Sequence, residues 1–387
     1  MSEVGLDIET LRRDEFAWMN TGEATYLNAA STGPLPERTV VAQERFTRMR
    51  AAPHRVSVEE QFGVLADCRA RLADLLNAGV GDIALAGNTG AGINLAAWGL
   101  PLEAGDIVLV PDREFPANIY PWDAAAAARG FAVHRIAARD GLVDEDALVA
   151  ALDVPGVRVL AASWVGFATG AVLDLARVGT ACRERGILFV VDAIQGLGAL
   201  TLNLQQVPVD ILACGAQKWL LSPWGTGFTY VAPHLLERIT VQPVSWMAVR
   251  DSDDFSRLLD YDLRWRTDAR RFEQVTLPFQ DFAGMAASLA LLQSLGPAAV
   301  TTHITRCTAA LLAGATSRGI SSVTPVTRHA GIAALRPADA AATSARLDAA
   351  RIIHSLREGT IRLAPHCYTT DADIESTLAA LVSAVRP

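Results

Sequence analysis

Lys218 is the residue in this chain with the clearest chemical meaning, because it is the only lysine. The sequence of 387 residues holds 34 basic residues, and the other 33 are arginine. This bias indicates that arginine serves wherever a positive charge alone is needed. A lysine that persists in such a chain has a task that an always-protonated guanidinium cannot perform. Nucleophilic attack of the amine on an aldehyde is the first hypothesis, and a chance surface lysine is its alternative.

An acid, Asp192, closes the apolar run ILFVV 26 residues before Lys218. A carboxylate at such a position is poorly solvated unless it has a partner. A pyridinium N–H would be that partner, and the contact would keep the ring protonated as an electron sink. Metal binding and a helix cap are the alternatives, but no HxxxH, HxE or paired-carboxylate spacing accompanies Asp192.

The segment GNTGAGIN at 87–94 follows a predicted strand and opens a predicted helix. Free backbone N–H groups and the positive end of the helix dipole favour a phosphate there, with the Thr89 hydroxyl as a further donor. The segment is neither a GxGxxG fingerprint nor a GxxxxGK loop, which argues against a dinucleotide or a nucleoside triphosphate. A nicotinamide oxidoreductase would also leave Lys218 without a role.

The elements that must position these residues alternate between short apolar runs and helix-like stretches up to about residue 245. This alternation predicts a mostly parallel sheet covered by helices. The predicted strands are residues 82–87, 106–111, 131–136, 157–165, 187–193, 210–215 and 225–231. Ligands of such sheets bind beyond the carboxyl ends of the strands, where Asp192, Lys218 and the glycine-rich turn fall.

The pattern after residue 245 predicts a smaller α+β C-terminal domain. It consists of a long apolar helix at 282–296, further helices, and two short strands near GIAALRP and GTIRLAP. We therefore expect a large α/β domain over residues 21–250 and a small domain over 251–387. The N-terminal segment 1–20 is expected to pack with the small domain.

Composition narrows the class of protein. The net charge is −8 and the arginines are scattered, which argues against nucleic-acid binding. No basic-then-apolar leader is present, and no stretch approaches the roughly 18 apolar residues of a membrane span. The five cysteines are odd in number and form no CxxC pair, which fits a reducing cytoplasm and no disulfide framework.

The order of glycine-rich turn, VDAIQG and CGAQKW resembles the class V aminotransferase and cysteine desulfurase family of pyridoxal 5′-phosphate (PLP) enzymes. The resemblance spans nearly the whole chain, including YLNAASTGPLP, EFPANIYPW, SWVGFATGAVLDL, RRFEQVTLP and TIRLAPHCY. It implies a fold-type I large domain with a mostly parallel mixed sheet, a smaller C-terminal domain, and an amino-acid substrate. It also implies a homodimer with active sites at the interface.

The resemblance implies a role for each matched residue. Lys218 would form the Schiff base with PLP and then move the proton at Cα, and Asp192 would contact the pyridine nitrogen. Arg362 would clamp the substrate carboxylate with its planar fork. The remaining positions are Thr89, Gly90, Ala91 and Gln217 at the phosphate, Gln195 at the phenolic oxygen, Phe115 stacked on the ring, Thr276 at the neighbouring subunit's phosphate, and Asn28 at the substrate.

Two departures from the family shape the expected reaction. Phe167 and Gly166 occupy the positions where relatives often have an asparagine near the phenolic oxygen. Gln195 would therefore contact that oxygen without a neighbouring asparagine. Residues 325–361 contain no cysteine, and Cys367 lies beyond Arg362, so the mobile nucleophile of cysteine desulfurases is missing.

We therefore expect a C–S β-lyase acting on a modified cysteine or a cysteine conjugate in specialised metabolism. The alternatives are an aminotransferase, an amino-acid epimerase resembling isopenicillin N epimerase, and a decarboxylating or oxidatively deaminating enzyme. A non-catalytic PLP-binding regulator is disfavoured, because the sequence shows no helix-turn-helix with a basic face.

Overall fold

The central feature of the computed structural model, which describes residues 6–382, is a seven-stranded sheet containing all seven predicted strands. Its order is β2-β8-β7-β6-β5-β3-β4, and only β8 runs antiparallel to its neighbours. The predicted mostly parallel sheet is thereby confirmed. The strands are β2 (Ile83–Ala86), β3 (Ile107–Pro111), β4 (Ala132–Ile136), β5 (Val157–Ser163), β6 (Leu188–Asp192), β7 (Ile211–Gly215) and β8 (Gly227–Val231).

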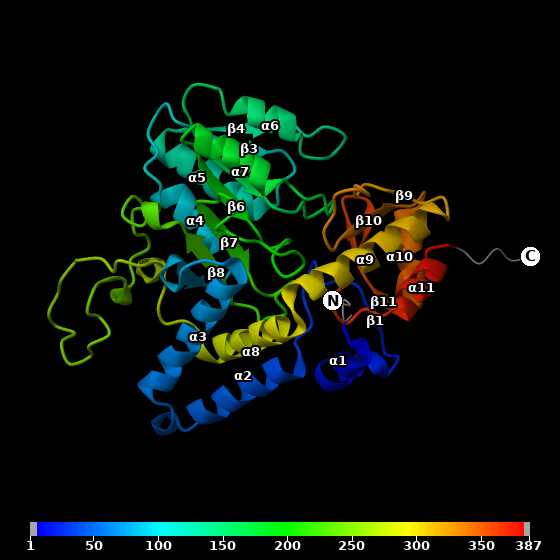
Figure 1. Cartoon of the computed structure of the whole chain (residues 1–387), viewed down its shortest axis with the longest axis horizontal. Helices are drawn as coiled ribbons and strands as arrows, with labels where there is room; N and C mark the ends of the chain where they lie inside the picture. Colours follow the sequence, from blue (N-terminus) through cyan, green and yellow to red (C-terminus); the bar gives the residue numbers. More distant parts are fainter. Residues whose placement is uncertain (1–5, 383–387) are drawn as a thin grey trace, which may run out of the picture.

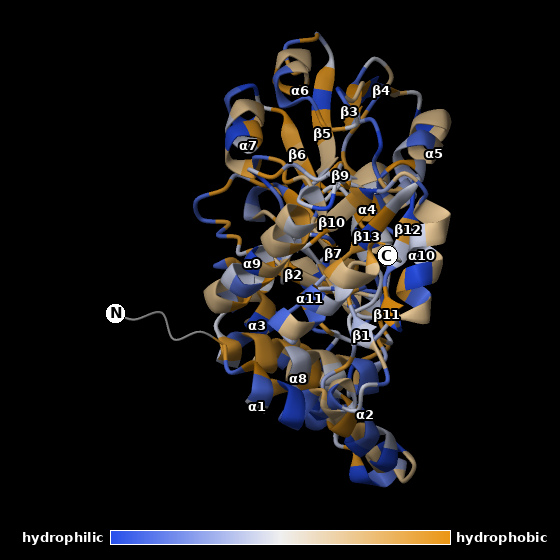
Figure 2. Ribbon diagram, turned by 90° about the vertical axis from the view of Figure 1, so that its right-hand side faces the viewer, coloured by the Kyte–Doolittle hydropathy of each residue, from blue (hydrophilic) through white to orange (hydrophobic). Residues whose placement is uncertain are grey.

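Helices bury both faces of this sheet (Figure 1). Side chains alternate along β6, so Phe189 and Val191 join one apolar cluster and Val190 joins the other. Strands β5 and β6 are largely coloured as hydrophobic in Figure 2, as expected of strands covered twice. The first cluster includes α3 (Val58–Leu76), α6 (Glu145–Ala151), α7 (Leu175–Glu184) and α8 (Phe279–Leu295), and the second includes α4 (Thr89–Gly99) and α5 (Tyr120–Arg129).

The C-terminal part forms a second, smaller sheet at one end of the molecule (Figure 1). Its order is β12-β13-β10-β9, all antiparallel, and the two strands predicted near GIAALRP and GTIRLAP are β10 and β13. Its elements are α9 (Pro297–Thr316), β9 (Ser321–Ser322), β10 (Ala333–Arg336), α10 (Ala340–Ala349), β12 (Ser355–Arg357), β13 (Thr360–Leu363) and α11 (Asp371–Ala380).

The N-terminal residues contact this C-terminal part. Arg12 of α1 (Ile8–Glu15) forms an ion pair with Asp373 and donates to the Tyr368 carbonyl at 2.7 Å. Strand β1 (Thr25–Tyr26) pairs in parallel with β11 (Ile352–Ile353). Helix α8 packs instead on α2 (Glu37–Arg50) and α3. The proposed boundaries at residues 20 and 250 therefore stay predictions, because contacts cross both of them.

Within residues 6–382, no single helix combines the length and apolar character that crossing a membrane requires. Helices α8 and α9 reach that composition only together, and they are bent by 82° at the break between them.

Candidate active site

Lys218 lies in the turn that follows β7, at the carboxyl edge of the sheet. Its Nζ sits 5.7 Å from the centre of the Phe115 ring. Burial is the main cause that lowers the pKa of Lys218 to about 8; the charge of Asp192 opposes this shift and the charge of Arg362 contributes to it. A substantial fraction of this amine is therefore neutral near pH 8, as a nucleophile and base requires.

Gly33 supports the lysine turn from the N-terminal segment. Its N–H donates to the Gln217 carbonyl at 2.8 Å, and a Cβ at this position would lie 2.1 Å from the carbonyl oxygen of Lys218. Any larger residue would push the turn away, so glycine is required by close approach of the two backbones.

Asp192 ends β6 beside the lysine turn and is 3% exposed. Its Oδ1 accepts the Ile194 N–H at 2.9 Å, whereas Oδ2 accepts no hydrogen bond from residues 6–382. Burial raises the pKa of Asp192 to about 6, although the Ile194 N–H and Lys218 both lower it. The second carboxylate oxygen is thus available to a cationic N–H of a ligand.

Two of the predicted phosphate-binding residues, Thr89 and Gln217, meet around Gly215, the last residue of β7. The Gly215 N–H donates to the Thr89 hydroxyl at 2.8 Å, and a Cβ at Gly215 would lie 2.6 Å from Oε1 of Gln217 and 3.3 Å from Oγ1 of Thr89. The Gln217 Oε1 is buried without a partner in the described chain. The Ala91 N–H is taken by the side chain of Asn88, which caps α4 at 3.1 Å.

Gln195 is buried and held from two sides. Its Nε2 donates to the Ala30 carbonyl at 3.0 Å, and its Oε1 accepts the indole N–H of Trp219 at 2.9 Å. These contacts leave one amide N–H of Gln195 for a ligand.

Arg362 of β13 is 3% exposed, yet it has no carboxylate partner within residues 6–382. Its guanidinium donates to the Ser355 hydroxyl (3.1 Å), the Phe167 carbonyl (2.8 Å) and the Ser31 hydroxyl (2.7 Å). Burial lowers its pKa to about 10, so the group remains a cation at neutral pH. A buried guanidinium surrounded only by neutral acceptors favours an anionic ligand.

Asn28 reaches the same edge from the segment after β1. It forms an isolated parallel bridge with Ala364, two residues after Arg362 in the chain. Its Oδ1 is buried without a partner in the described residues. The structure thus brings Asn28 and Arg362 to neighbouring backbone positions.

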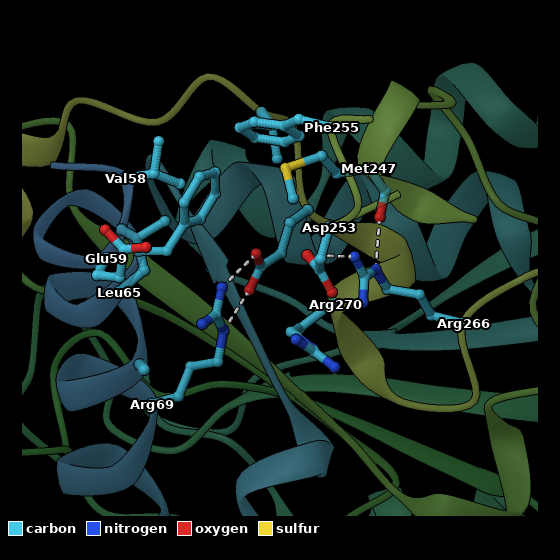
Figure 3. Close-up of a pocket in the computed structure, with 13 residues that line it drawn as sticks. Val58, Glu59, Leu65, Arg69, Met247, Asp253, Phe255, Arg266 and Arg270 are labelled. Atoms are coloured by element: carbon cyan, nitrogen blue, oxygen red, sulfur yellow. Dashed lines mark hydrogen bonds and ion pairs between the residues drawn. The ribbon is translucent and has the colours of Figure 1, made fainter. Parts of the chain in front are cut away.

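Phe115 and Thr276 have different surroundings. Phe115 is 44% exposed and packs edge-on against Phe167, with ring centres 5.3 Å apart. Thr276 is exposed and forms no hydrogen bond with another predicted site residue in the described chain. Its neighbour Val275 lines the separate pocket of Figure 3, which has a volume of about 320 Å³.

That separate pocket lies between α3 and the 247–275 segment. Arg69 and Glu273 form a two-pronged ion pair at 2.6 and 2.8 Å along its floor, and Arg266 donates to the Met247 carbonyl (Figure 3). The Arg and Glu charges satisfy each other, and the pocket includes none of the predicted site residues.

A larger cavity of about 980 Å³ adjoins Phe115 and Phe167. It lies between the loops at the carboxyl edge of the large sheet and the turns of the small one. Its walls are mostly apolar and include Phe115, Leu142, Val143, Phe167, Val172, Leu173 and Pro325. The charged residues of the lining are Asp112, Arg113, Glu114, Glu145, Arg328 and Glu358.

Sequence reasoning missed Glu114 and Ser163, whose side chains meet at this edge. The Glu114 carboxylate accepts the Ser163 N–H at 2.8 Å and also binds the Ser163 hydroxyl. The available signal was the position of Glu114 beside Phe115 in EFPANIYPW.

The residues present fit PLP. The Oδ2 of Asp192 suits a protonated ring nitrogen, and the Thr89 hydroxyl and the Gln217 amide N–H groups can donate to a phosphate. Arg362, which has no carboxylate partner within residues 6–382, suits a substrate carboxylate. Lys218 lies at the same edge with a lowered pKa. Together with the sheet, these groups fit the site of a fold-type I PLP enzyme.

Comparisons with known proteins agree. The family model "Aminotransferase class-V" matches residues 25–376, so the chain belongs to the class V aminotransferase family and is a PLP-dependent enzyme. The cofactor and family expected from the sequence are confirmed.

Two curated relatives of this chain carry different activities in their names. The isopenicillin N epimerase of Streptomyces clavuligerus is 34% identical over 227 residues, which cover 57% of this chain and 56% of the epimerase. A probable cysteine desulfurase of Methanothermobacter thermautotrophicus is 30% identical over 284 residues, covering 72% of this chain and 69% of that protein. The match thus spans little more than half of the epimerase's length.

Solved structures extend the likeness across the whole fold. The cystine C–S lyase C-DES, solved with its product cysteine persulfide, has a TM-score of 0.86 and 25% identity, covering 95% of this chain and 99% of that one. The apo cysteine desulfurase of Thermococcus onnurineus also has a TM-score of 0.86, at 20% identity, and supports the fold alone.

Proposed function

We propose that this protein is a C–S β-lyase acting on a modified cysteine or a cysteine conjugate of specialised metabolism. The observation that carries the proposal is the 980 Å³ cavity beside Phe115 and Phe167. Its mostly apolar walls offer space for a substituent on the sulfur, which free cysteine would leave unfilled. The structural likeness to a cystine C–S lyase supports the same reaction class.

We propose the following cofactor contacts. Asp192 binds the pyridine nitrogen, Gln195 the phenolic oxygen, and Phe115 packs on the ring. The phosphate is held by Thr89, Gly90, Ala91 and Gln217, with Thr276 from the neighbouring subunit. The N–H of Ala91 is already bonded to Asn88, so it contributes only if that cap is exchanged for the phosphate. When bound, PLP supplies an electron sink for charge that develops at Cα.

The protein's own residues then direct the reaction. Arg362 and Asn28 hold the substrate carboxylate, and the Lys218 amine takes the Cα proton. The Cβ–S bond breaks, the electron pair leaves with sulfur as a thiolate, and the proton held on Lys218 can neutralise it. Hydrolysis of the three-carbon remainder gives pyruvate and ammonia, so atoms and charge balance.

The cysteines support a lyase over a desulfurase. All five are free and buried, and burial raises the pKa of the Cys367 thiol beyond the range in which it would ionise. None falls within 325–361, the segment before Arg362. A persulfide carried on an enzyme thiol is therefore disfavoured. Free buried thiols also fit the reducing cytoplasm that we propose as the compartment.

Product analysis tests the reaction class. The holoenzyme is incubated with L-cysteine, L-cystine and S-benzyl-L-cysteine, and pyruvate, thiol, keto acid and D-amino acid are quantified. We expect pyruvate and thiol in equal amounts, with the benzyl conjugate turned over at least as well as cysteine. Lys218→Arg is the inactive control.

A D-amino acid without thiol release would refute the lyase and favour an epimerase, the alternative supported by 34% identity to isopenicillin N epimerase. A keto acid retaining the sulfur substituent would identify an aminotransferase. Carbon dioxide release would identify a decarboxylating enzyme, and oxygen consumption an oxidative deaminase.

A further inference from the structure

Glu114 is a partly buried acid at the active-site edge that the proposed reaction does not use. It lies three residues after β3, and its carboxylate reaches across to the end of β5. There it accepts the Ser163 N–H at 2.8 Å, bonds the Ser163 hydroxyl, and accepts Nδ2 of Asn118 at 3.1 Å. Within residues 6–382 it pairs with no arginine, lysine or histidine. Three neutral donors thus satisfy an acid that no cation neutralises.

These bonds close a turn around Phe115. Asn118 binds the Glu114 carboxylate through its side chain, and its backbone N–H donates to the Phe115 carbonyl at 2.8 Å. Asn118 is fully buried, so one end of the turn is fixed in the protein interior. Ser163, in the sheet, fixes the other end through Glu114. The Phe115 ring itself is 44% exposed, so its contact with Phe167 covers only part of it.

The 112–118 turn carries the Phe115 ring, which lies near Lys218. The Phe115 ring faces the Lys218 amine at 5.7 Å and touches Phe167 at 5.3 Å. Ser163 is also the register partner of Asp192 across β5 and β6. A carboxylate bonded to Ser163 therefore ties the aromatic residue to the strand position next to the acid of the site.

We propose that Glu114 is a positioning residue, which clamps the 112–118 turn to the end of β5 and so holds the Phe115 ring over Lys218. The physical reason for an acid is its acceptor capacity: one carboxylate accepts a backbone N–H, a hydroxyl and an amide at once. Burial raises the pKa of Glu114 to about 7, and the hydrogen bonds from Ser163 and Asn118 oppose this shift. The proposal rests on the proposed role of Phe115 at the cofactor.

The single lysine allows a direct test. Full-length protein labelled with ¹³C-lysine gives one side-chain signal, from Lys218, and a phenyl ring near the amine shifts that signal upfield. In Glu114→Ala we expect most of this ring-current shift to disappear in the cofactor-free protein. We expect PLP to bind about three- to tenfold more weakly in the same variant, the range of one lost aromatic contact.

Three further variants separate the effect of the hydrogen bonds from that of charge and from loss of the ring. Glu114→Gln retains an acceptor for the Ser163 N–H and can donate to its hydroxyl, but its NH₂ group cannot accept from Asn118, so the lysine signal should lie between those of Glu114→Ala and the wild type. Glu358→Gln removes an exposed acid on the same cavity and should leave the signal unchanged. Phe115→Leu defines the signal without a ring.

The outcomes are distinct. A folded Glu114→Ala protein with the wild-type lysine shift would overturn the proposal, and so would a Glu114→Gln variant that resembles Phe115→Leu. If Glu114→Ala does not fold, Ser163→Ala removes one donor of the clamp and should give a partial loss of the shift. Because the signal is measured without substrate, a different reaction class would leave this result unaffected.

Discussion

The indole N–H of Trp219 donates a 2.9 Å hydrogen bond to Oε1 of Gln195. Indole nitrogen can only donate and the Ala30 carbonyl, 3.0 Å from Nε2, can only accept. The orientation of the Gln195 amide is therefore determined by its partners, and the hydrogen that these bonds leave over is an N–H of Nε2. Trp219, the residue after the lysine, thus fixes the amide that we propose to contact the cofactor's phenolic oxygen.

Replacing Trp219 by Phe should allow this amide to turn. A turned amide would present oxygen to the phenolic oxygen, so the pKa of the holoenzyme's visible absorption band should rise. Removal of one such hydrogen bond corresponds to about 1 kcal/mol, or roughly 0.7 of a pH unit. Spectra recorded between pH 6 and 10 give the shift. Gln195→Leu should produce a similar change, and the double variant should add little.

The Lys218 amine should titrate near pH 8 in the cofactor-free protein, well below an ordinary lysine. The single ¹³C-lysine signal measures this midpoint directly. Because Asp192 raises and Arg362 lowers the pKa of Lys218, Asp192→Asn should move the midpoint down and Arg362→Gln should move it up. A midpoint near 10.5 in the wild type would show that the amine is fully hydrated.

Asp192 should destabilise the cofactor-free fold at alkaline pH. Its folded pKa of about 6 exceeds the ordinary 3.8, so the folded chain binds this proton more tightly than the unfolded chain does. The cost is absent below pH 3.8, appears between pH 3.8 and 6, and is complete above pH 6. Asp192→Asn should therefore be about 2–3 kcal/mol more stable than wild type at pH 8, with little difference at pH 4.

Urea unfolding at the two pH values measures this difference. The same variant should bind PLP poorly, because a neutral amide cannot pair with a pyridinium. A variant less stable than wild type at pH 8 would show that the attraction between Asp192 and Lys218 outweighs the cost of burial.

Arg362→Lys should raise KM for the amino-acid substrate about 10- to 100-fold, the value of a charge-assisted two-pronged contact. The cofactor spectrum should stay unchanged, because the guanidinium is proposed to hold substrate. Arg357→Lys, an exposed neighbour on the same hairpin, is the matched control. Unchanged kinetics in Arg362→Lys would remove this residue from the site.

One exposed apolar surface is a candidate interface for the proposed homodimer. The loop between β8 and α8 projects from the molecule (Figure 1), and it exposes several large apolar side chains: Val244, Trp246, Phe255, Leu258, Leu259, Tyr261 and Leu263. Exposed patches of this kind mark contact sites. Leu259→Asp with Tyr261→Ser should convert a dimer to monomers in light scattering, whereas Val154→Asp, at another exposed valine, should not. A wild-type monomer would contradict the dimer.

The sequence was informative wherever a short pattern dictated a strand. The runs ending in Asp192 and Gly215 are apolar on successive residues, and a strand covered on both faces has this pattern. Their shared direction then places Asp192 and Lys218 at one edge. The resemblance added Arg362, which lies on β13, over 140 residues beyond the lysine. No local sequence pattern predicts that this strand lies beside the lysine turn.

What could not be foreseen were the contacts between loops. Glu114 and Ser163 are 49 residues apart, and only the packing of β3 beside β5 shows that they bond. Likewise the Asn88 cap that occupies the Ala91 N–H depends on the direction of one side chain. Neither propensity nor periodicity determines such directions, because several rotamers suit the same backbone.

The support of Gly33 beneath the lysine turn has a consequence for biosynthesis. Residues 27–33 reach Lys218 at one end, but at the other end Leu27 and Ala29 bond to Ile353 and Ala364. A ribosome makes residues 353 and 364 long after the lysine. The reactive amine therefore leaves the ribosome well before the residues that complete the frame around its backbone.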